Sequence, residues 1–332
     1  MRDKKNIVVI GGGTGTHTVL RGLKRYQKQA HLSAVVTMAD SGGSTGRLRD
    51  EFGYLPVGDV RMALAALASD IDHHEELLRE LFLYRFDKGE GLSGHNFGNL
   101  LLVALSDILG SEEAAIAAAG KLLRVQGKVI PVTTQPVHLV AQYADGETVI
   151  GEHDIDEPAS DRAQSTITNL SVTPAATISE RAEDALLQAD LIVLGPGDLY
   201  TSVLANIVVD GVAQAVRNSS ATVVYVSNLM TKLGQTTGMG VAQHVAELET
   251  YIGQAPDCVL VNTTELPPDL VQRYEADGEY PVEFNLESTG CRVISADLLA
   301  TEAVQTAAGD TLKRSLIRHD SRKLARKLIE LL

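Results

Sequence analysis

The sequence lacks tryptophan, has few aromatic residues and carries only two cysteines, and each shortage excludes a class of protein. Aromatic residues make up 4% of the 332 residues, which is too few for stacking against the bases of a nucleic-acid strand. Cys258 and Cys291 cannot build a disulfide framework and are typical of a reducing compartment. No apolar run approaches the ~20 residues that a membrane-spanning helix needs.

Positive charge is also scarce. The chain has 29 Lys and Arg against 43 Asp and Glu, which gives a formal net charge of −14. A field of that sign repels nucleic acids and anionic membranes, although backbone N–H groups can still bind a phosphate locally. The first apolar run follows residue 5 and leaves no room for a secretory signal. We therefore expect a cytoplasmic protein that binds no nucleic acid and has no membrane span.

Short apolar runs alternate with segments of helical spacing along most of the chain. The runs that we interpret as strands are 6–10, 33–39, 128–134, 189–194, 222–227 and 258–262. The main helices are expected at 19–26, 59–69, 74–86, 97–109, 112–124 and 321–332. Such repeated βα units predict one doubly wound, mostly parallel Rossmann-like sheet in a three-layer α/β/α arrangement.

Residues 135–178 differ from this pattern, because they are rich in Thr and Asp and contain a turn at Asp145-Gly146. We interpret them as a small antiparallel β insertion. Since no linker or internal repeat is evident, we expect a single domain over residues 1–332, with 135–178 as a β-rich subdomain within it.

Three polar, glycine-bearing loops follow predicted strands. Glycines let backbone N–H groups approach an anion, and the helix that follows favours negative charge at its start. Because ligands bind outside the carboxyl ends of the strands in such sheets, these loops are the candidate ligand site. Their candidate residues are Gly11, Gly12, Gly13, Thr14 and Gly15 in the first loop, Asp40, Ser41, Gly42 and Arg47 in the second, and Gly195, Pro196, Gly197, Tyr200, Thr201 and Ser202 in the third.

Several residue types in and near these loops suit a phosphate-linked ligand. Arg47 can hold a phosphate with its planar guanidinium, and Asp40 can hold Mg²⁺ or a substrate hydroxyl. Asp198, Thr201 or Ser202 can instead cap the following helix, and the same alternative applies to Asn96. Asn99 lies three residues after Asn96, on the same face of a helix, and Asn228 follows another strand.

Two common nucleotide motifs do not fit. A dinucleotide fingerprint starting at Gly11 would require a third glycine where Thr16 stands, and a dehydrogenase has no need of the second glycine-rich loop. No Gly-Lys-Ser/Thr sequence follows either loop, which excludes the Walker pattern.

Seven segments, taken in order, resemble the gluconeogenesis-factor family, whose fold is shared with the 2-phospho-L-lactate transferases. They are IVVIGGGTGTHTVLRGLK, VVTMADSGGSTGRLR, GDVRMALAALA, SGHNFGNLLLVAL, LGPGDLYTSVLAN, YVSNLMTK and IRHDSRKLA. The resemblance covers nearly the whole chain. It implies a regulator that binds UDP-N-acetylglucosamine and supports cell shape and envelope synthesis during growth on gluconeogenic carbon.

The resemblance also implies site residues. It places residues 11–15, Asp40, Asn96, Asn99 and 195–202 around the ligand. By motif position, Tyr274 and Arg318 match residues that contact the UDP-sugar, and Ser321 matches a position that is a phosphorylatable Thr in some relatives. The alternative that it suggests is a transferase with Mg²⁺ and a nucleoside-diphosphate-linked donor, in which Asp40 would be the catalytic or metal-binding residue.

The chain departs from the family pattern at three places. The family carries two adjacent acids where this chain has Asp40-Ser41, and Lys232 and Gln235 replace a neutral residue and an acid. Residues 297–317 are longer than the family pattern predicts. No protein partner follows from these residues, and a homodimer is the default expectation from the frequency of such assemblies.

Overall fold

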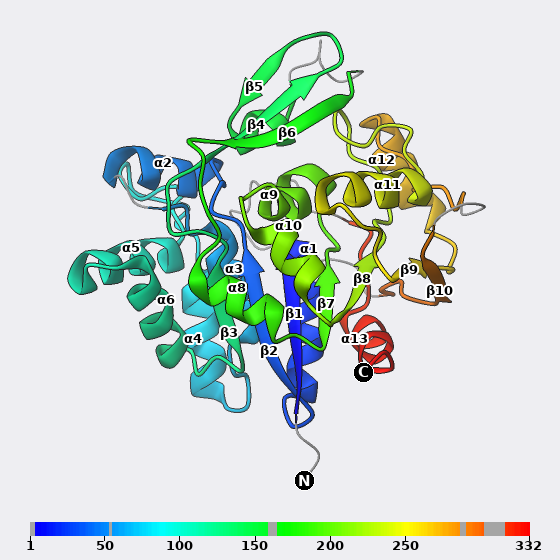
Figure 1. The fold of residues 1–332 in the computed structure, drawn as a ribbon. Coiled ribbons are helices and arrows are strands. Elements are labelled where there is room, and N and C mark those ends of the chain that lie inside the picture. Colours follow the sequence, from blue (N-terminus) through cyan, green and yellow to red (C-terminus); the bar gives the residue numbers. More distant parts are fainter. Residues whose placement is uncertain (1–3, 53–54, 159–164, 286–289, 302–315) are drawn as a thin grey trace.

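A parallel sheet forms the centre of the molecule. The computed structural model describes residues 4–52, 55–158, 165–285, 290–301 and 316–332. Within them, seven strands pair in the order β10-β9-β8-β7-β1-β2-β3, all parallel (Figure 1). Their bounds are Lys5–Gly11 (β1), Ala30–Val36 (β2), Lys128–Pro131 (β3), Leu191–Leu194 (β7), Thr222–Val226 (β8), Cys258–Asn262 (β9) and Arg292–Ala296 (β10).

The strand order reverses beside β1. The chain runs outward from β1 to β2 and β3, and then returns to the other side of β1 as β7. Ile10 of β1 pairs with Leu194 of β7, so both strands end at the same edge of the sheet. This reversal is a topological switch point, which is where ligands bind in open α/β sheets.

Helices cover both faces of the sheet, because side chains on both sides of each strand are apolar. Val8 and Ile10 belong to one buried cluster, and Ile7 and Val9 belong to the other. The first cluster includes residues of α8 (Glu180–Leu187), α10 (Val212–Asn218) and α11 (Val241–Ile252). The second includes residues of α1 (Gly13–Leu23), α3 (Gly58–Leu67), α4 (His73–Leu83), α5 (Phe97–Leu109), α6 (Glu112–Leu122) and α13 (Ser321–Ile329). The predicted α/β/α layers are confirmed.

A small antiparallel sheet stands over the carboxyl end of the main sheet, at the top of Figure 1. Its strands β4 (His138–Tyr143), β5 (Thr148–Ile150) and β6 (Ile167–Thr173) pair in the order β5-β4-β6. This sheet confirms the antiparallel strands that we expected within 135–178. A short helix, α7 (Glu152–Asp156), follows β5.

Five elements were not predicted: α2 (Gly43–Phe52), α7, α8, α12 (Pro268–Ala276) and β10. The stretch from Asp40 to Arg47 was interpreted as a loop because of its glycines, and this was wrong from Gly43 onward. Gly46 lies inside α2. Position 46 requires a glycine because a Cβ there would lie 2.1 Å from the Ser41 carbonyl oxygen. A close approach of two backbone segments, and not a flexible loop, requires that glycine.

The remaining short elements lie near the third loop and after α1. They are a 3₁₀ turn (Lys24–Tyr26), a π-helical turn (Leu199–Leu204) and α9 (Ala205–Ile207). Most of the segment 297–317, predicted to be longer than in the family, lies outside the described residues. Among the described residues, no helix is long and apolar enough to cross a membrane.

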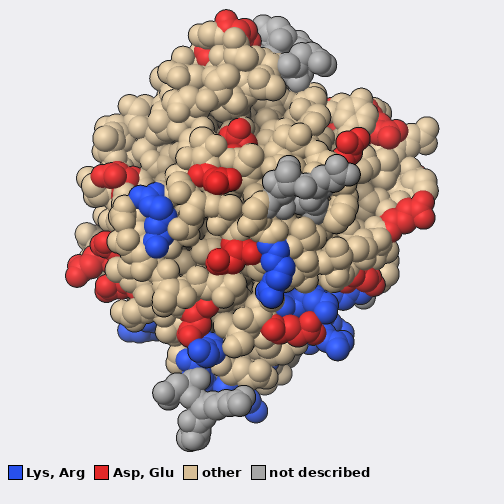
Figure 2. Space-filling view, turned by 45° about the vertical axis from the view of Figure 1, so that its right-hand side comes forward, with Lys and Arg blue, Asp and Glu red and all other residues tan. Residues whose placement is uncertain are grey.

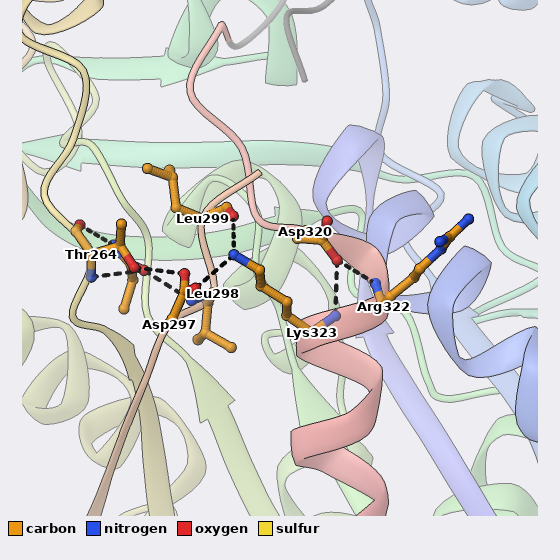
Figure 3. Close-up of polar contacts among 8 residues, drawn as sticks. Thr264, Asp297, Leu298, Leu299, Asp320, Arg322 and Lys323 are labelled. Carbon is orange, nitrogen blue, oxygen red and sulfur yellow. Dashed lines mark hydrogen bonds and ion pairs between the residues drawn. The ribbon is translucent and has the colours of Figure 1, made fainter. Parts of the chain in front are cut away.

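The start of α13 is held by a network of polar contacts (Figure 3). Asp320 caps the helix by accepting from the Arg322 and Lys323 N–H groups at 2.8 and 2.9 Å. The Lys323 ammonium donates to Asp297 at 2.7 Å and to the Leu299 carbonyl at 3.0 Å. These contacts hold the start of α13, which packs against α1, to the segment 297–299. They thereby position the residues just before α13.

Gly22 marks the closest contact between α1 and α13, because a Cβ there would lie 1.9 Å from the Ser321 carbonyl oxygen. We expect Gly22→Ala to lower the free energy of unfolding by about 1–3 kcal/mol, since the two helices must move apart. Urea denaturation measures this change. The matched control is Gly120→Ala in α6, where a Cβ would meet no atom closer than 3.8 Å. That variant should be stabilised by about 0.5–1 kcal/mol, and equal effects of the two substitutions would contradict the packing argument.

Candidate functional site

The first and third glycine loops meet at the switch point. A Cβ on Gly15 would lie 2.0 Å from the Pro196 carbonyl oxygen, and one on Gly197 would lie 3.2 Å from the Ser202 Cβ and 3.6 Å from the Gly12 carbonyl oxygen. The two loops therefore pack backbone against backbone, which a side chain at Gly15 would prevent. Thr14 lies half-buried in the first turn of α1. The structure thus brings together the 11–15 and 195–202 segments that the sequence singled out.

A carboxylate occupies the anion-binding end of the first loop. The Gly13 N–H donates to Asp59 Oδ1 at 2.7 Å, and a Cβ on Gly12 would lie 2.3 Å from Asp59 Oδ2. Asp59 lies in the first turn of α3. The loop binds a negative group here, as its amides and helix start predict, but the group is the protein's own side chain.

Backbone N–H groups of the second loop also donate to the protein's own carboxylates. The Gly42 N–H donates to the Asp40 carboxylate at 2.9 Å, and the Ser41 N–H donates to Glu152 at 3.4 Å. The Ser41 hydroxyl accepts from the His153 N–H at 2.9 Å. Helix α7 of the β insertion is therefore joined to the end of β2.

A further acidic side chain from α7 reaches the third loop. Asp156 accepts from the Thr201 hydroxyl at 3.2 Å and from the Gln235 amide at 3.1 Å. The Lys232 ammonium lies 3.4 Å from the other Asp156 oxygen. Lys232 and Gln235, two departures from the family pattern, thus hold the same carboxylate.

Burial and mutual repulsion raise the pKa values of these acids. Burial, and then the nearby Asp40 carboxylate, raise the pKa of Asp59 from 3.8 to about 7. Burial and the same neighbour raise the pKa of Glu152 well above its ordinary value. Burial and Asp156 raise the pKa of Asp198 to about 6. Asp198 and Asp156 in turn raise the pKa of Lys232 against the effect of its burial, so the site holds more negative than positive charge.

The exposed charges are unevenly distributed over the surface as well. On the face shown in Figure 2, most of the Lys and Arg side chains lie in the lower half, whereas Asp and Glu extend over the upper half. The carboxyl ends of the strands, where the candidate site lies, point to the upper half (Figure 1). A phosphate-bearing ligand at this end therefore has to overcome local negative charge.

A divalent cation would relieve this repulsion. Mg²⁺ in nucleotide sites needs only one or two carboxylates, because phosphates and water supply its other ligands. Asp40 and Asp59 fit this requirement, since Asp40 Oδ2 would contact a Cβ placed on Gly58, next to Asp59. No group of three His, Cys, Asp or Glu side chains in the described residues is arranged to hold a metal by itself.

Asn96 and Asn99 are used within the protein. Asn96 caps α5 by accepting from the Gly98 and Asn99 N–H groups, which is the alternative that the sequence left open. The Asn99 amide oxygen accepts from the Arg61 side chain at 2.8 Å, and its NH₂ group donates to Ser44 and Thr45 of α2. These contacts connect α5 to α2 and α3, behind the second loop.

Arg47 points away from the first loop, toward the segment that precedes α5. Its side chain is exposed and donates to the Ser93 carbonyl at 3.1 Å. A Cβ on the neighbouring Gly94 would lie 2.9 Å from the same guanidinium. In this arrangement Arg47 fastens α2 to residues 93–94.

The third loop is braced by two asparagines. The Asn228 amide donates to the Gly197 carbonyl at 2.9 Å, and its oxygen accepts from the Tyr225 hydroxyl. Asn206, which was not predicted, donates to the carbonyls of Ser202 at 2.8 Å and Gly11 at 3.4 Å. Tyr200 is only 2% exposed and packs in the hydrophobic core, so its ring does not line the loop surface.

Tyr274 and Arg318 are linked through the backbone. The Tyr274 hydroxyl accepts from the N–H groups of Leu316 and Ile317 at 2.7 and 3.3 Å, directly before Arg318. Tyr274 is 9% exposed and packs against Ile317, which leaves its ring little surface for stacking. Burial lowers the pKa of His17 in α1 to about 4, and the positive charges of Arg79, Arg21 and Arg318 add to this effect, so Arg318 lies within electrostatic range of that helix. Ser321 is the first residue of α13, and it is half-buried.

The sequence reasoning missed Glu152 and Asp156 as residues of the site. Both lie in the acidic stretch EHDID of α7, inside a segment interpreted only as a β insertion. Three acidic residues within five consecutive positions were the available signal. Nothing in the local pattern indicates that this stretch meets loops that lie about 110 and 45 residues away in sequence.

The raised pKa of Asp59 predicts a pH-dependent stability. Between about pH 4 and 7 the folded state keeps a proton on Asp59 that the unfolded state has lost, so stability falls as pH rises through this range. Asp59→Asn keeps the acceptor for Gly13 and removes the buried charge. We expect its melting midpoint to exceed that of the parent by about 2–4 °C at pH 8 and by little at pH 4. Thermal melts across this range measure the difference, with the exposed Asp87→Asn as control, and an equal gain at both pH values would contradict the assignment.

Comparisons with known proteins agree with this architecture. The family model described as 2-phospho-L-lactate transferase CofD matches residues 7–299. A gluconeogenesis factor of Bacillus subtilis is 38% identical, with 100% of this chain and 99% of that protein aligned. One of Listeria innocua is 39% identical, with 99% of this chain and 96% of that protein aligned.

A solved structure gives the same result for the fold. The crystal structure of a UPF0052-family protein from Bacillus halodurans superimposes with a TM-score of 0.88 at 34% sequence identity. The match covers 99% of this chain and 100% of that one. The chain therefore belongs to the gluconeogenesis-factor family, within the group of CofD-like proteins.

Proposed function

We propose that this chain is a cytoplasmic, UDP-sugar-binding regulator of cell shape and envelope synthesis during growth on gluconeogenic carbon, with UDP-N-acetylglucosamine as its ligand. The observation that carries the proposal is the packing of two glycine loops at the switch point, where a Cβ on Gly15 would lie 2.0 Å from the Pro196 carbonyl oxygen. Close backbone approach next to a helix start is the arrangement that a diphosphate site requires. The names of the relatives support a role in gluconeogenic growth.

The protein's own carboxylates define how a diphosphate would enter. Asp59 accepts from the Gly13 N–H, so a phosphate at that amide must displace this side chain or share a cation with it. Arg318 near α1 and Lys232 beside Asp156 are the cations that would face the ligand. Mg²⁺ held by Asp40 and Asp59 would neutralise charge between the carboxylates and the diphosphate.

A transferase with a nucleoside-diphosphate-linked donor is the second candidate. The observation that favours it is Asp59, whose pKa of about 7 suits a general base at physiological pH. Transfer of a phosphorus-containing group needs mainly positioning and charge stabilisation, so the site requires no nucleophilic triad. The family model's name supports this class of reaction.

Ligand titration separates the two functions. The full chain is titrated with UDP-N-acetylglucosamine, UDP, GDP and NAD, with and without Mg²⁺, by thermal melts and then calorimetry. A ligand at about 100 times its Kd should stabilise the fold by about 2.7 kcal/mol, a shift of a few degrees. A response to the UDP-sugar without turnover supports the regulator. A response confined to GDP with Mg²⁺ supports the transferase, and no response to any UDP compound contradicts the proposal.

Arg318 provides the sharpest single-residue test. We expect Arg318→Ala to weaken UDP-sugar binding by about 1.5–3 kcal/mol, because a charged group with several hydrogen bonds to the diphosphate is lost. The matched control is Arg322→Ala, whose side chain is exposed and points away from the contacts in Figure 3. Calorimetry gives both affinities, and an unchanged Kd in Arg318→Ala would remove this residue from the site.

A further inference from the structure

We propose that a hollow at the open edge of the sheet is a second binding site, for a small molecule with two negative charges and a short apolar body. The hollow has a volume of about 310 Å³ and lies between α6, the edge strand β3 and α8. Lys128, the first residue of β3, lines it, so it opens near the amino end of that strand. The glycine loops lie at the opposite, carboxyl end of the strands, which makes this site distinct from the one described above.

Four cationic residues line the hollow: Lys121, Arg124, Lys128 and Arg181. Arg124 is engaged in an ion pair with Glu75 at 2.8 Å. The side chains of Lys121, Lys128 and Arg181 form no ion pair with any residue in the described ranges. In a chain with 43 acidic and 29 basic residues, acids are available in excess to pair with such cations. Lys121, Lys128 and Arg181, which have no such ion pair in the described ranges, repel one another, and an anion between them would remove that repulsion.

Arg181 lines the hollow from the start of α8. It lies in the first turn of α8, whose Ncap is Ser179. The helix dipole disfavours a positive charge at that end and favours an anion there. Glu180 and Glu183 in the first turn already complement the dipole of α8, so an anion near Arg181 would be stabilised by the cations of the hollow.

Gly120 keeps the hollow open. It lies inside α6, where glycine is about 0.5–1 kcal/mol less favourable than alanine. A Cβ at Gly120 would meet only Leu64 at 3.8 Å and Val125 at 3.9 Å, which are ordinary contacts. Gly127, also in the wall, differs because its Cβ would lie 2.8 Å from the Leu32 carbonyl oxygen. Packing thus explains Gly127 and leaves Gly120 without a structural requirement, whereas a larger residue at 120 would fill the space.

The lining determines the class of ligand. Ile116, Val125 and Val129 supply apolar surface below the cations, and the volume is at the low end for ligand pockets. A molecule with a short hydrocarbon part and two charges at one end satisfies both features. A phosphate monoester and a dicarboxylate share this chemistry, and aromatic probes of each kind distinguish them.

The experiment titrates the full chain with phenyl phosphate, phthalate and inorganic phosphate by calorimetry. We expect saturable binding of phenyl phosphate or phthalate with one site per chain, tighter than that of inorganic phosphate because the apolar part is also buried. Tighter binding of phenyl phosphate assigns the site to phosphate monoesters, and tighter binding of phthalate assigns it to dicarboxylates.

Three variants locate the binding. Lys128→Gln should weaken it by roughly ten-fold or more, as expected for the loss of a charge-assisted hydrogen bond. Gly120→Leu should abolish it by filling the hollow, while circular dichroism and a thermal melt confirm that the helix is retained. The control Lys28→Gln removes an exposed lysine outside the hollow and should leave binding unchanged.

Two results would overturn the proposal. One is the absence of saturable binding of all three probes to the parent chain. The other is binding that survives both Lys128→Gln and Gly120→Leu but is lost in Arg318→Ala, since the probes would then occupy the glycine loops instead.

Discussion

The close approach of the loops that follow β1 and β7 is the constraint on which the rest of the candidate site depends. Gly15 lies against the Pro196 carbonyl with no room for a Cβ, and this contact exists only because the strand order reverses between β1 and β7. Asn206 and Asn228 brace the same loops through their carbonyl oxygens. The candidate site is therefore built from backbone held by side chains, an arrangement that suits phosphate recognition without a large positive field.

The second property of the site is its negative charge. The carboxylates of Asp59 and Glu152 accept hydrogen bonds from backbone N–H groups of the glycine loops. Burial raises the pKa of both carboxyl groups. Such an arrangement lowers stability at neutral pH, which is a common consequence of building a binding site. Lys232 partly offsets the repulsion through Asp156, so the positive residue that departs from the family pattern has a clear electrostatic partner in this chain.

The β insertion contributes to the site as well as to the fold. Helix α7 follows β5 and joins the segments that leave three parallel strands, β2, β7 and β8, through Ser41, Thr201 and Gln235. Its acidic residues contact the second and third loops, although they belong to a segment whose sequence is typical of surface strands and turns. Any ligand that enters between the loops meets side chains from both the main sheet and the insertion, so the two parts are coupled through the same carboxylates.

The sequence by itself determined the layers, most of the strands and helices and the three glycine loops, because apolar runs and glycine clusters are local signals of burial and of backbone approach. It also placed Asn96 as a possible cap, which SGHNFG indicates locally. Tertiary structure alone decided that Asp59 fills the first loop, that Asn99 pairs with Arg61 and that Tyr274 holds the backbone before Arg318. These contacts join residues 38 to 46 positions apart, and a single sequence carries no signal for a pairing that depends on how the sheet brings distant loops to one edge.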